Sequence, residues 1–157
     1  MKKIKTLFTI AFLTIATSVS AQQISENAIG LRIGDNDGLG AEISYQRHIG
    51  GNNRLEFDLG FRDSNNVEAF KLVGLYQWVR PIDGNFNWFL GAGAGIGSYD
   101  TPVSDGTFAL AAGNVGIEYN FDFPLLISLD MRPELSFDDT YSDDLDFDIA
   151  LSIRYQF

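Results

Sequence analysis

Apolar and polar residues alternate along most of the chain, and residues 145–157 show the alternation most clearly. Every second residue from Leu145 to Phe157 is apolar, whereas the residues between them are Asp, Ala, Ser, Arg and Gln. Successive side chains of a β-strand point to opposite faces, so a period of two predicts a strand with one apolar and one polar face. The pattern alone leaves open which face meets water.

Seven clusters of Gly, Asn, Asp and Pro interrupt the alternating segments at regular intervals. Such clusters mark turns, so the chain is expected to form eight strands joined by seven turns. The predicted strands cover residues 27–34, 38–49, 54–63, 67–80, 85–99, 107–121, 124–137 and 145–157. No segment shows the 3.6-residue period of an amphipathic helix, and no linker suggests a second domain. These features predict an all-β chain with a single folded domain.

The first 21 residues have the features of a secretory signal peptide. Three lysines at positions 2, 3 and 5 precede a mostly apolar run at residues 7–15, and small residues at 18–21 predict cleavage after Ala21. The apolar run is shorter than the ~20 residues of a membrane-spanning helix. We therefore expect residues 1–21 to be a signal peptide and residues 22–157 to form the β-barrel domain.

Charge and cysteine content exclude several classes of function. The chain has 21 acidic against 11 basic residues and a net charge of −10, and three of its lysines lie in the signal peptide. Nucleic-acid binding needs clustered basic residues, so we expect no nucleic-acid partner. The chain has no cysteine, which excludes disulfides and thiolate metal sites.

Charges of both signs share the polar face of the predicted strands. In a water-soluble barrel this face would meet solvent, and the apolar face would line the interior. In a membrane barrel the charges would be packed inside an eight-stranded lumen, where they can neutralise one another. Register counting from the turns places Asp58 near Lys71 and Arg132 near Asp148. The charged residues assigned to this face are Arg32, Arg54, Arg62, Lys71, Arg132, Arg154, Glu42, Glu56, Asp58, Glu118, Asp130, Glu134, Asp146 and Asp148.

Aromatic residues gather near both ends of the predicted strands, which favours the membrane barrel. Two aromatic bands around an aliphatic zone are typical of transmembrane β-barrels. Predicted strands of about 10 residues or more are long enough to cross a bilayer when tilted, and an even number of strands closes the sheet. One band contains Trp78, Phe86, Trp88, Tyr119, Phe121, Phe123, Tyr155 and Phe157, and the other Phe61, Phe70, Tyr99, Phe137 and Tyr141.

The predicted strand at residues 85–99 carries glycine at four alternate positions, 91, 93, 95 and 97. A phosphate-binding loop is a poor interpretation, because no amphipathic helix follows. Interior glycine weakens a strand, so a steric reason is more plausible. We expect these glycines to make room in the lumen for long Arg, Glu and Phe side chains of neighbouring strands.

The signal peptide, the eight alternating segments and the ending Ile149-x-Leu151-x-Ile153-x-Tyr155-x-Phe157 resemble the small eight-stranded outer-membrane barrels of the OmpA/OmpX type, a porin-like family. The resemblance implies an antiparallel, up-and-down transmembrane β-barrel in the cell outer membrane, surrounded by lipid and lipopolysaccharide, and a monomer. It also implies that the barrel-assembly machinery reads the final strand through Phe157. The short predicted loops do not favour adhesion, and we expect no peptidoglycan-binding domain after the barrel.

No catalytic, cofactor or metal site is assigned from the sequence. The single histidine, His48, is expected to be a hydrogen-bonding residue at the rim, since Ser44 is too far along the same strand for a nucleophile–base pair. The acidic loop is expected to be solvated, although its carboxylates could bind calcium. Residues 35–38 are interpreted as a hairpin turn with Gly38 at positive φ. The acidic loop contains Asp138, Asp139, Asp143 and Asp144.

The most plausible function is a structural or envelope-stabilising outer-membrane protein without enzymatic activity, with an ion-paired interior and no wide pore. A soluble secreted barrel that binds a small hydrophobic ligand is one alternative. An outer-membrane lipid-modifying enzyme is the other, and it predicts loss of activity in His48→Ala.

Overall fold

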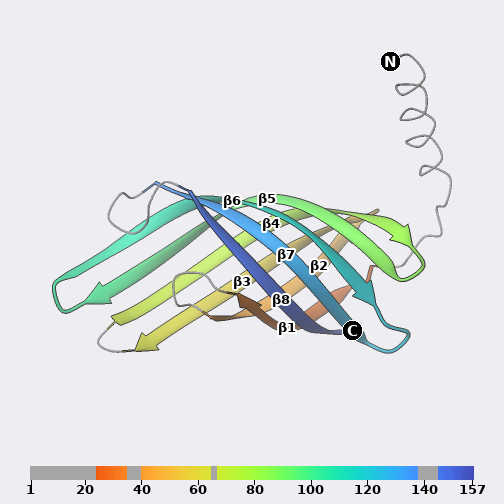
Figure 1. The fold of residues 1–157 in the computed structure, drawn as a ribbon, viewed down its shortest axis with the longest axis horizontal. Coiled ribbons are helices and arrows are strands. Elements are labelled where there is room, and N and C mark those ends of the chain that lie inside the picture. The colour runs from red at the N-terminus through yellow and green to blue at the C-terminus, as the bar shows by residue number, and fades with distance from the viewer. Residues whose placement is uncertain (1–23, 35–39, 65–66, 138–144) are drawn as a thin grey trace, which may run out of the picture.

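Eight antiparallel strands form one closed barrel in which each strand pairs with its neighbours in sequence and β1 pairs with β8 (Figure 1). The computed structural model describes residues 24–34, 40–64, 67–137 and 145–157, without the side chains of residues 62–64 and 67. The eight-stranded up-and-down barrel predicted from the sequence is confirmed. The strands are β1 (Asn27–Gly34), β2 (Ala41–Gly50), β3 (Asn53–Ser64), β4 (Val67–Asp83), β5 (Phe86–Thr101), β6 (Ser104–Asn120), β7 (Leu125–Ser136) and β8 (Asp146–Gln156).

The strands differ in length, and the longest ones are adjacent. β4 and β6 have 17 residues and β5 has 16, whereas β1 has eight and β2 has ten. The predicted ends fall short by three residues in β4 and by two in β5, and the predicted start of β6 is three residues late, because pairing continues to Asp83↔Phe86 and Thr101↔Ser104. The sheet extends furthest at β4–β6, at the end opposite the start of β1 and the end of β8 (Figure 1).

The two ends of the barrel are named here by what they contain. The terminal end holds the start of β1 and the end of β8, where Asn27 and Phe157 exchange two backbone hydrogen bonds of 2.9 Å each. The far end holds the connections β1–β2, β3–β4, β5–β6 and β7–β8. No helix among the described residues is long and apolar enough to cross a membrane.

The burial of β8 decides which face of the strands is inside. Ile149 and Tyr155 are 61% and 58% exposed, whereas Asp148 and Arg154 are each 1% exposed. The same arrangement holds around the barrel: many of the buried residues are Arg, Lys, Asp or Glu, and most of the exposed large hydrophobic residues are Ile, Leu, Phe or Trp. The apolar face is therefore outside, and the soluble alternative with an apolar face lining a ligand cavity is not supported.

Two tight turns at the terminal end depend on glycine. Gly51 in the β2–β3 turn has φ +58° and Gly84 in the β4–β5 turn has φ +52°, a left-handed region that L side chains rarely adopt. Both turns were predicted from the sequence. Gly38, predicted to have positive φ, lies outside the described residues.

The glycines of β5 face the lumen, as predicted, but the side chains beside them differ from the expected ones. A Cβ on Gly97 would collide with Phe108, and a Cβ on Gly95 would lie 3.0 Å from Val73 Cγ2 and 3.1 Å from Leu110 Cδ1. A Phe side chain lies beside the glycines, as expected. The expected Arg and Glu side chains do not, because aliphatic side chains of β4 and β6 fill this space. They belong to a buried apolar cluster of Val73, Leu75, Phe108, Leu110 and Ala112.

A larger residue at Gly93 is expected to destabilise the barrel. Its Cβ would meet the backbone oxygen of Gly74 and lie 2.9 Å from Leu75 Cα, atoms that cannot move without disturbing the β4–β5 ladder. Gly93→Val should lower the free energy of unfolding by about 1–3 kcal/mol, the usual range for overpacking, in urea titrations of vesicle-embedded protein. Ala94→Val, on the exposed face of the same strand, is the control and should change it little. Equal effects of both variants would contradict the steric role.

Candidate functional site: the charged lumen and the apolar outer surface

Among the described side chains, five basic and seven acidic ones lie in the lumen, and each is at most 5% exposed. Water-accessible charges need no partner, but a buried charge is costly unless it is paired and hydrogen-bonded. The pairs formed here fall into two groups that lie at different heights in the barrel. The charged lumen residues are Arg32, Arg54, Lys71, Arg132, Arg154, Glu42, Glu56, Asp58, Glu118, Asp130, Glu134 and Asp148.

The first group, the Arg132 cluster, is centred on a guanidinium of β7. Arg132 Nη1 lies 2.9 Å from Asp58, Nη2 lies 2.7 Å from Glu42, and Nε lies 2.7 Å from Glu134. Because Asp58 is on β3 and Glu42 on β2, these ion pairs cross the lumen. The guanidinium therefore connects strands that share no backbone hydrogen bonds.

Two further cations complete the Arg132 cluster. Arg32 lies 3.0 Å from Glu42 and 2.7 Å from Asp130, and it also pairs with Asp148. Lys71 Nζ lies 3.0 Å from Glu134 and 3.9 Å from Glu42. Among the described side chains, the cluster thus combines three cations with five carboxylates. It connects six strands: β1, β2, β3, β4, β7 and β8.

The second group, the Arg154 cluster, lies nearer the terminal end. Arg154 Nη2 lies 3.1 Å from Glu56, and its other nitrogens donate to Ser44 Oγ at 2.9 Å and Ser128 Oγ at 2.8 Å. Arg54 lies 2.7 Å from Glu118, and its guanidinium is 5.1 Å from the centre of the Phe89 ring. The two cations of this cluster are matched by two carboxylates.

Amide side chains join the two clusters into one network. Arg54 Nε donates to Gln77, whose amide donates to Asn114 at 2.9 Å, and Asn114 donates to Asp130 at 3.1 Å. At the terminal end, buried Leu126 and Ala28 help to line a cavity of about 10 Å³. A volume of that size is about one water-sized probe, so little open space is left there.

The structure brings together some of the charge pairs predicted from register and not others. Arg132 and Asp148 are register partners, and their side chains lie 3.4 Å apart, as predicted. Asp58 lies opposite Val73, and its ion pair is with Arg132, whereas no pair joins it to Lys71 among the described side chains. Asp146 is half-buried at the edge of the lumen, and the side chain of Arg62 lies outside the described part.

His48 lies at the terminal rim, where its Nε2 is 2.9 Å from the backbone oxygen of Gly51. Ser44, the nearest serine on that strand, accepts a hydrogen bond from Arg154 instead. The geometry thus gives no nucleophile–base pair between these two residues. Within the described chain, no group of three or more His, Cys, Asp or Glu side chains could hold a metal ion, and the acidic loop at 138–144 lies outside it.

The outer surface has an apolar belt with aromatic side chains at both ends. At the terminal end, Phe86, Tyr119, Phe121 and Phe123 form successive ring contacts with centroids 4.7–5.2 Å apart. At the far end, the rings of Phe61 and Phe70 lie 5.7 Å apart. The predicted bands are therefore present, but two members differ: Tyr99 packs on the apolar cluster inside the lumen, and Tyr141 lies outside the described residues.

The apolar cluster of β4 and β6 is the main feature of the lumen that sequence reasoning missed. Val73 and Leu75 lie between the polar residues Lys71 and Gln77 on the same face of β4, so the sequence pattern of this strand does not predict an apolar cluster. The signal was present in β5, since four lumen-facing glycines between two strands require large neighbours to fill the space they leave.

Removing the central cation of the Arg132 cluster is expected to be strongly destabilising. Arg132→Met keeps much of the volume but leaves Asp58, Glu42 and Glu134 buried with fewer cations. The free energy of unfolding should fall by about 3–5 kcal/mol, as for other broken buried ion pairs. The control is Arg47→Met at the exposed terminal rim, where the pair with Glu26 at 2.9 Å should contribute at most ~1 kcal/mol. A small, equal effect of both changes would contradict a bracing role.

Solved structures with the same fold are small bacterial barrels. The N-terminal barrel domain of Pseudomonas aeruginosa OprF aligns with a TM-score of 0.68 at 12% identity, over 86% of this chain and all of that one. Neisserial surface protein A aligns with a TM-score of 0.60 at 13% identity, over 83% of this chain and 94% of that one. The attachment invasion locus protein Ail of Yersinia pestis aligns with a TM-score of 0.52 at 16% identity, over 85% of this chain and 97% of that one.

No protein-family model and no curated sequence matches the chain. At identities of 12–16%, the structural matches establish the architecture and leave activity open. The chain has the fold of the small eight-stranded outer-membrane β-barrels.

Proposed function

We propose that the protein is a monomeric integral protein of the outer membrane with a structural, envelope-stabilising role. The inversion of its surfaces carries this proposal: the apolar residues of β8 face outward, whereas Asp148, Ser152 and Arg154 are buried. In water such an exterior would aggregate, whereas in a bilayer it meets hydrocarbon and the closed sheet leaves no unpaired edge. The aromatic residues at both ends fit the two membrane–water interfaces.

The proposal includes a lumen without a wide pore. Eight strands enclose an interior that side chains just fill, and here the Arg132 cluster, the Arg154 cluster and the apolar cluster occupy it. Leu126 and Ala28 are also buried at the terminal end. Transport of solutes through the barrel is therefore not part of the proposed role.

The same packing argues against enzymatic activity. Catalytic acids and bases need access to a substrate, whereas these carboxylates are buried and most of their oxygens contact Arg, Lys or an amide. His48 is bonded to a turn carbonyl rather than to a nucleophile. We accordingly propose no reaction for this protein, and His48→Ala should leave its behaviour unchanged.

The proposed partners are the lipid and lipopolysaccharide around the apolar belt, together with the barrel-assembly machinery. The outward face of β8, with Ile149, Leu151, Ile153 and Tyr155, forms an apolar stripe that ends at Phe157. The rings of Tyr155 and Phe157 stack with centroids 6.1 Å apart, which fixes the terminal side chain beside the strand. This arrangement supports recognition of the last strand during insertion.

Fractionation of expressing Gram-negative cells tests the membrane assignment. The protein should be recovered with the outer membrane and migrate differently in SDS gels with and without boiling, because a closed barrel resists SDS until heated. Vesicles containing it should remain impermeable to small sugars. Recovery as a soluble periplasmic monomer would overturn the proposal, and sugar entry would overturn the closed lumen.

A separate experiment, deletion of the gene from its own host, tests the envelope-stabilising role. Deletion cells should release more periplasmic protein and become more sensitive to detergent, and the wild-type gene should restore both properties. A variant without the first 21 residues provides the control, since it should not reach the envelope. An unchanged envelope in the deletion cells would contradict a structural role.

Replacing the last residue should reduce insertion without reducing the stability of inserted protein. Phe157→Ala removes the ring proposed to be read by the assembly machinery, so the boiling-sensitive fraction in the outer membrane should fall several-fold. Phe123→Ala is a matched control, because Phe123 is 58% and Phe157 59% exposed at the same end of the barrel. Equal losses for both variants would indicate a general girdle effect and contradict specific recognition.

A further inference from the structure

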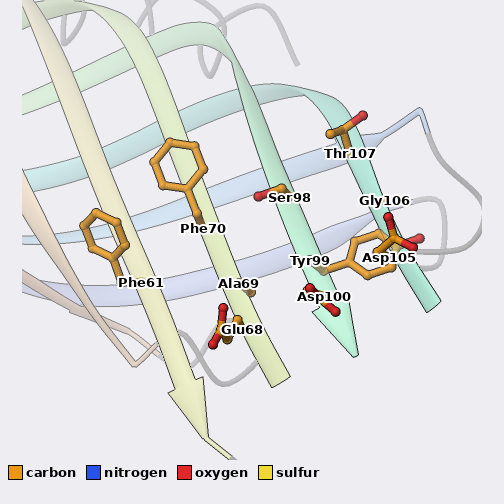
Figure 2. A pocket seen from close by; sticks show the side chains of 10 residues that line it. All are labelled: Phe61, Glu68, Ala69, Phe70, Ser98, Tyr99, Asp100, Asp105, Gly106 and Thr107. Carbon is orange, nitrogen blue, oxygen red and sulfur yellow. The ribbon is translucent and has the colours of Figure 1, made fainter. Parts of the chain in front are cut away.

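A cleft of about 870 Å³ lies at the far end of the barrel, along the extended part of β3, β4, β5 and β6 (Figure 2). It lies beside the lumen network and shares none of its charged residues. The described side chains that line it carry aromatic, hydroxyl and carboxyl groups, and none of them is Lys, Arg or His. The lining residues used below are Phe61, Phe70, Ser98, Glu68, Asp100 and Asp105.

The register arranges these side chains in two parallel rows across the strands. In the row nearer the apolar belt, Phe61 pairs with Phe70 and Phe70 pairs with Ser98. In the next outward-facing row, two residues further toward the far end, Glu68 pairs with Asp100 and Asp100 with Asp105. The cleft therefore passes from aromatic to acidic over one strand repeat, about 7 Å.

The acidic row lacks compensating charge. Like charges directly opposite each other destabilise a sheet, and Glu68, Asp100 and Asp105 are consecutive cross-strand neighbours. No ion pair joins any of the three to another described residue, although every cation in the lumen has carboxylate partners. Asp63 of β3 is the register partner of Glu68, so the row has an acidic position on four adjacent strands.

The side chains of the cleft favour an organic cation over a metal ion or an anionic lipid headgroup. A metal ion needs converging ligands, and the described side chains form no group that could hold one. Anionic lipid headgroups would be repelled by the carboxylates. An ammonium or guanidinium group fits better, because carboxylates attract it, and the exposed ring of Phe61 and the half-buried ring of Phe70 can contact its stem or the apolar residue beside it.

We propose that this cleft binds a basic amphipathic peptide segment of another molecule. Its apolar side chains lie on the Phe61–Phe70 pair, and its Lys or Arg side chains lie along Glu68, Asp100 and Asp105. That row crosses two inter-strand spacings, about 10 Å, which is room for two cationic groups. This binding site is additional to the structural role and does not depend on it.

The test uses the folded protein in phosphatidylcholine nanodiscs and a fluorescent synthetic peptide of alternating lysine and leucine. Anisotropy should detect binding above that of empty nanodiscs, and added salt should weaken it because the contacts are exposed. The same peptide with glutamate in place of lysine should not bind. Absence of lysine-peptide binding beyond the empty-nanodisc level would overturn the proposal.

Variants locate the binding. Removing three charges in Glu68→Gln/Asp100→Asn/Asp105→Asn should weaken peptide binding about tenfold, as expected for losing several exposed ion pairs. The matched control removes three exposed carboxylates at the terminal end, in Glu26→Gln/Asp83→Asn/Asp122→Asn, and should retain wild-type affinity. Equal affinities for the two triple variants would show that only net charge matters and would overturn the site.

Three further measurements test the location and the chemistry of the site. Asp100→Asn alone, at the centre of the row, should weaken binding measurably even if the triple variant folds poorly. Phe61→Ala should weaken it with little change in its salt dependence, because it removes apolar contact rather than charge. Calorimetry with calcium ions in place of the peptide should show no binding, and calcium binding that the triple variant loses would indicate a metal site instead.

Discussion

Closure of the sheet between β1 and β8 is the constraint on which the rest of the structure depends. Asn27 and Phe157 exchange backbone hydrogen bonds at the point where the chain begins and ends the barrel. A closed sheet satisfies its backbone without water, so its exterior can be entirely apolar. Closure with eight strands also fixes the lumen at a width that side chains must fill. Every inward-facing residue must therefore find its partner among the other inward-facing residues.

The lumen meets this requirement in two ways on opposite sides of the barrel. Most charges come from β1, β2, β3, β7 and β8, and they neutralise one another across the lumen, with Arg132 reaching carboxylates on β2 and β3. On the side of β4–β6, glycines of β5 leave space for Phe108 and Leu110 beside Val73. Buried ion pairs are weak sources of stability, but they strongly penalise any register that separates them. The charges therefore specify the register, and the apolar cluster supplies ordinary packing.

Sequence periodicity predicted the number of strands and the residues that share a face, and the aromatic bands indicated that the charged face lies inside. The buried positions of Val73, Leu75 and Tyr99 were not predicted. Ion-pair partners were harder to predict. Arg132 and Asp148 are register neighbours and were found, whereas the partner of Asp58 is a residue four strands away around the lumen. Such contacts depend on barrel diameter and side-chain length, which local patterns do not contain. The strand ends were also misplaced, because β5 continues through polar residues that resemble a turn.

The two sets of carboxylates in this barrel show how charge distinguishes structural from binding surfaces. In the lumen, Glu42 lies within ion-pair distance of Arg32 and Arg132, so its charge is used by the fold itself. At the far end, Asp100 stands between Glu68 and Asp105 with no described ion pair, so the fold bears the cost of the row without gaining from it. An exposed row of this kind can retain its charges because water solvates them. A cationic partner that relieves their repulsion would gain free energy that the isolated barrel cannot obtain, and this is the physical basis of the proposed peptide site.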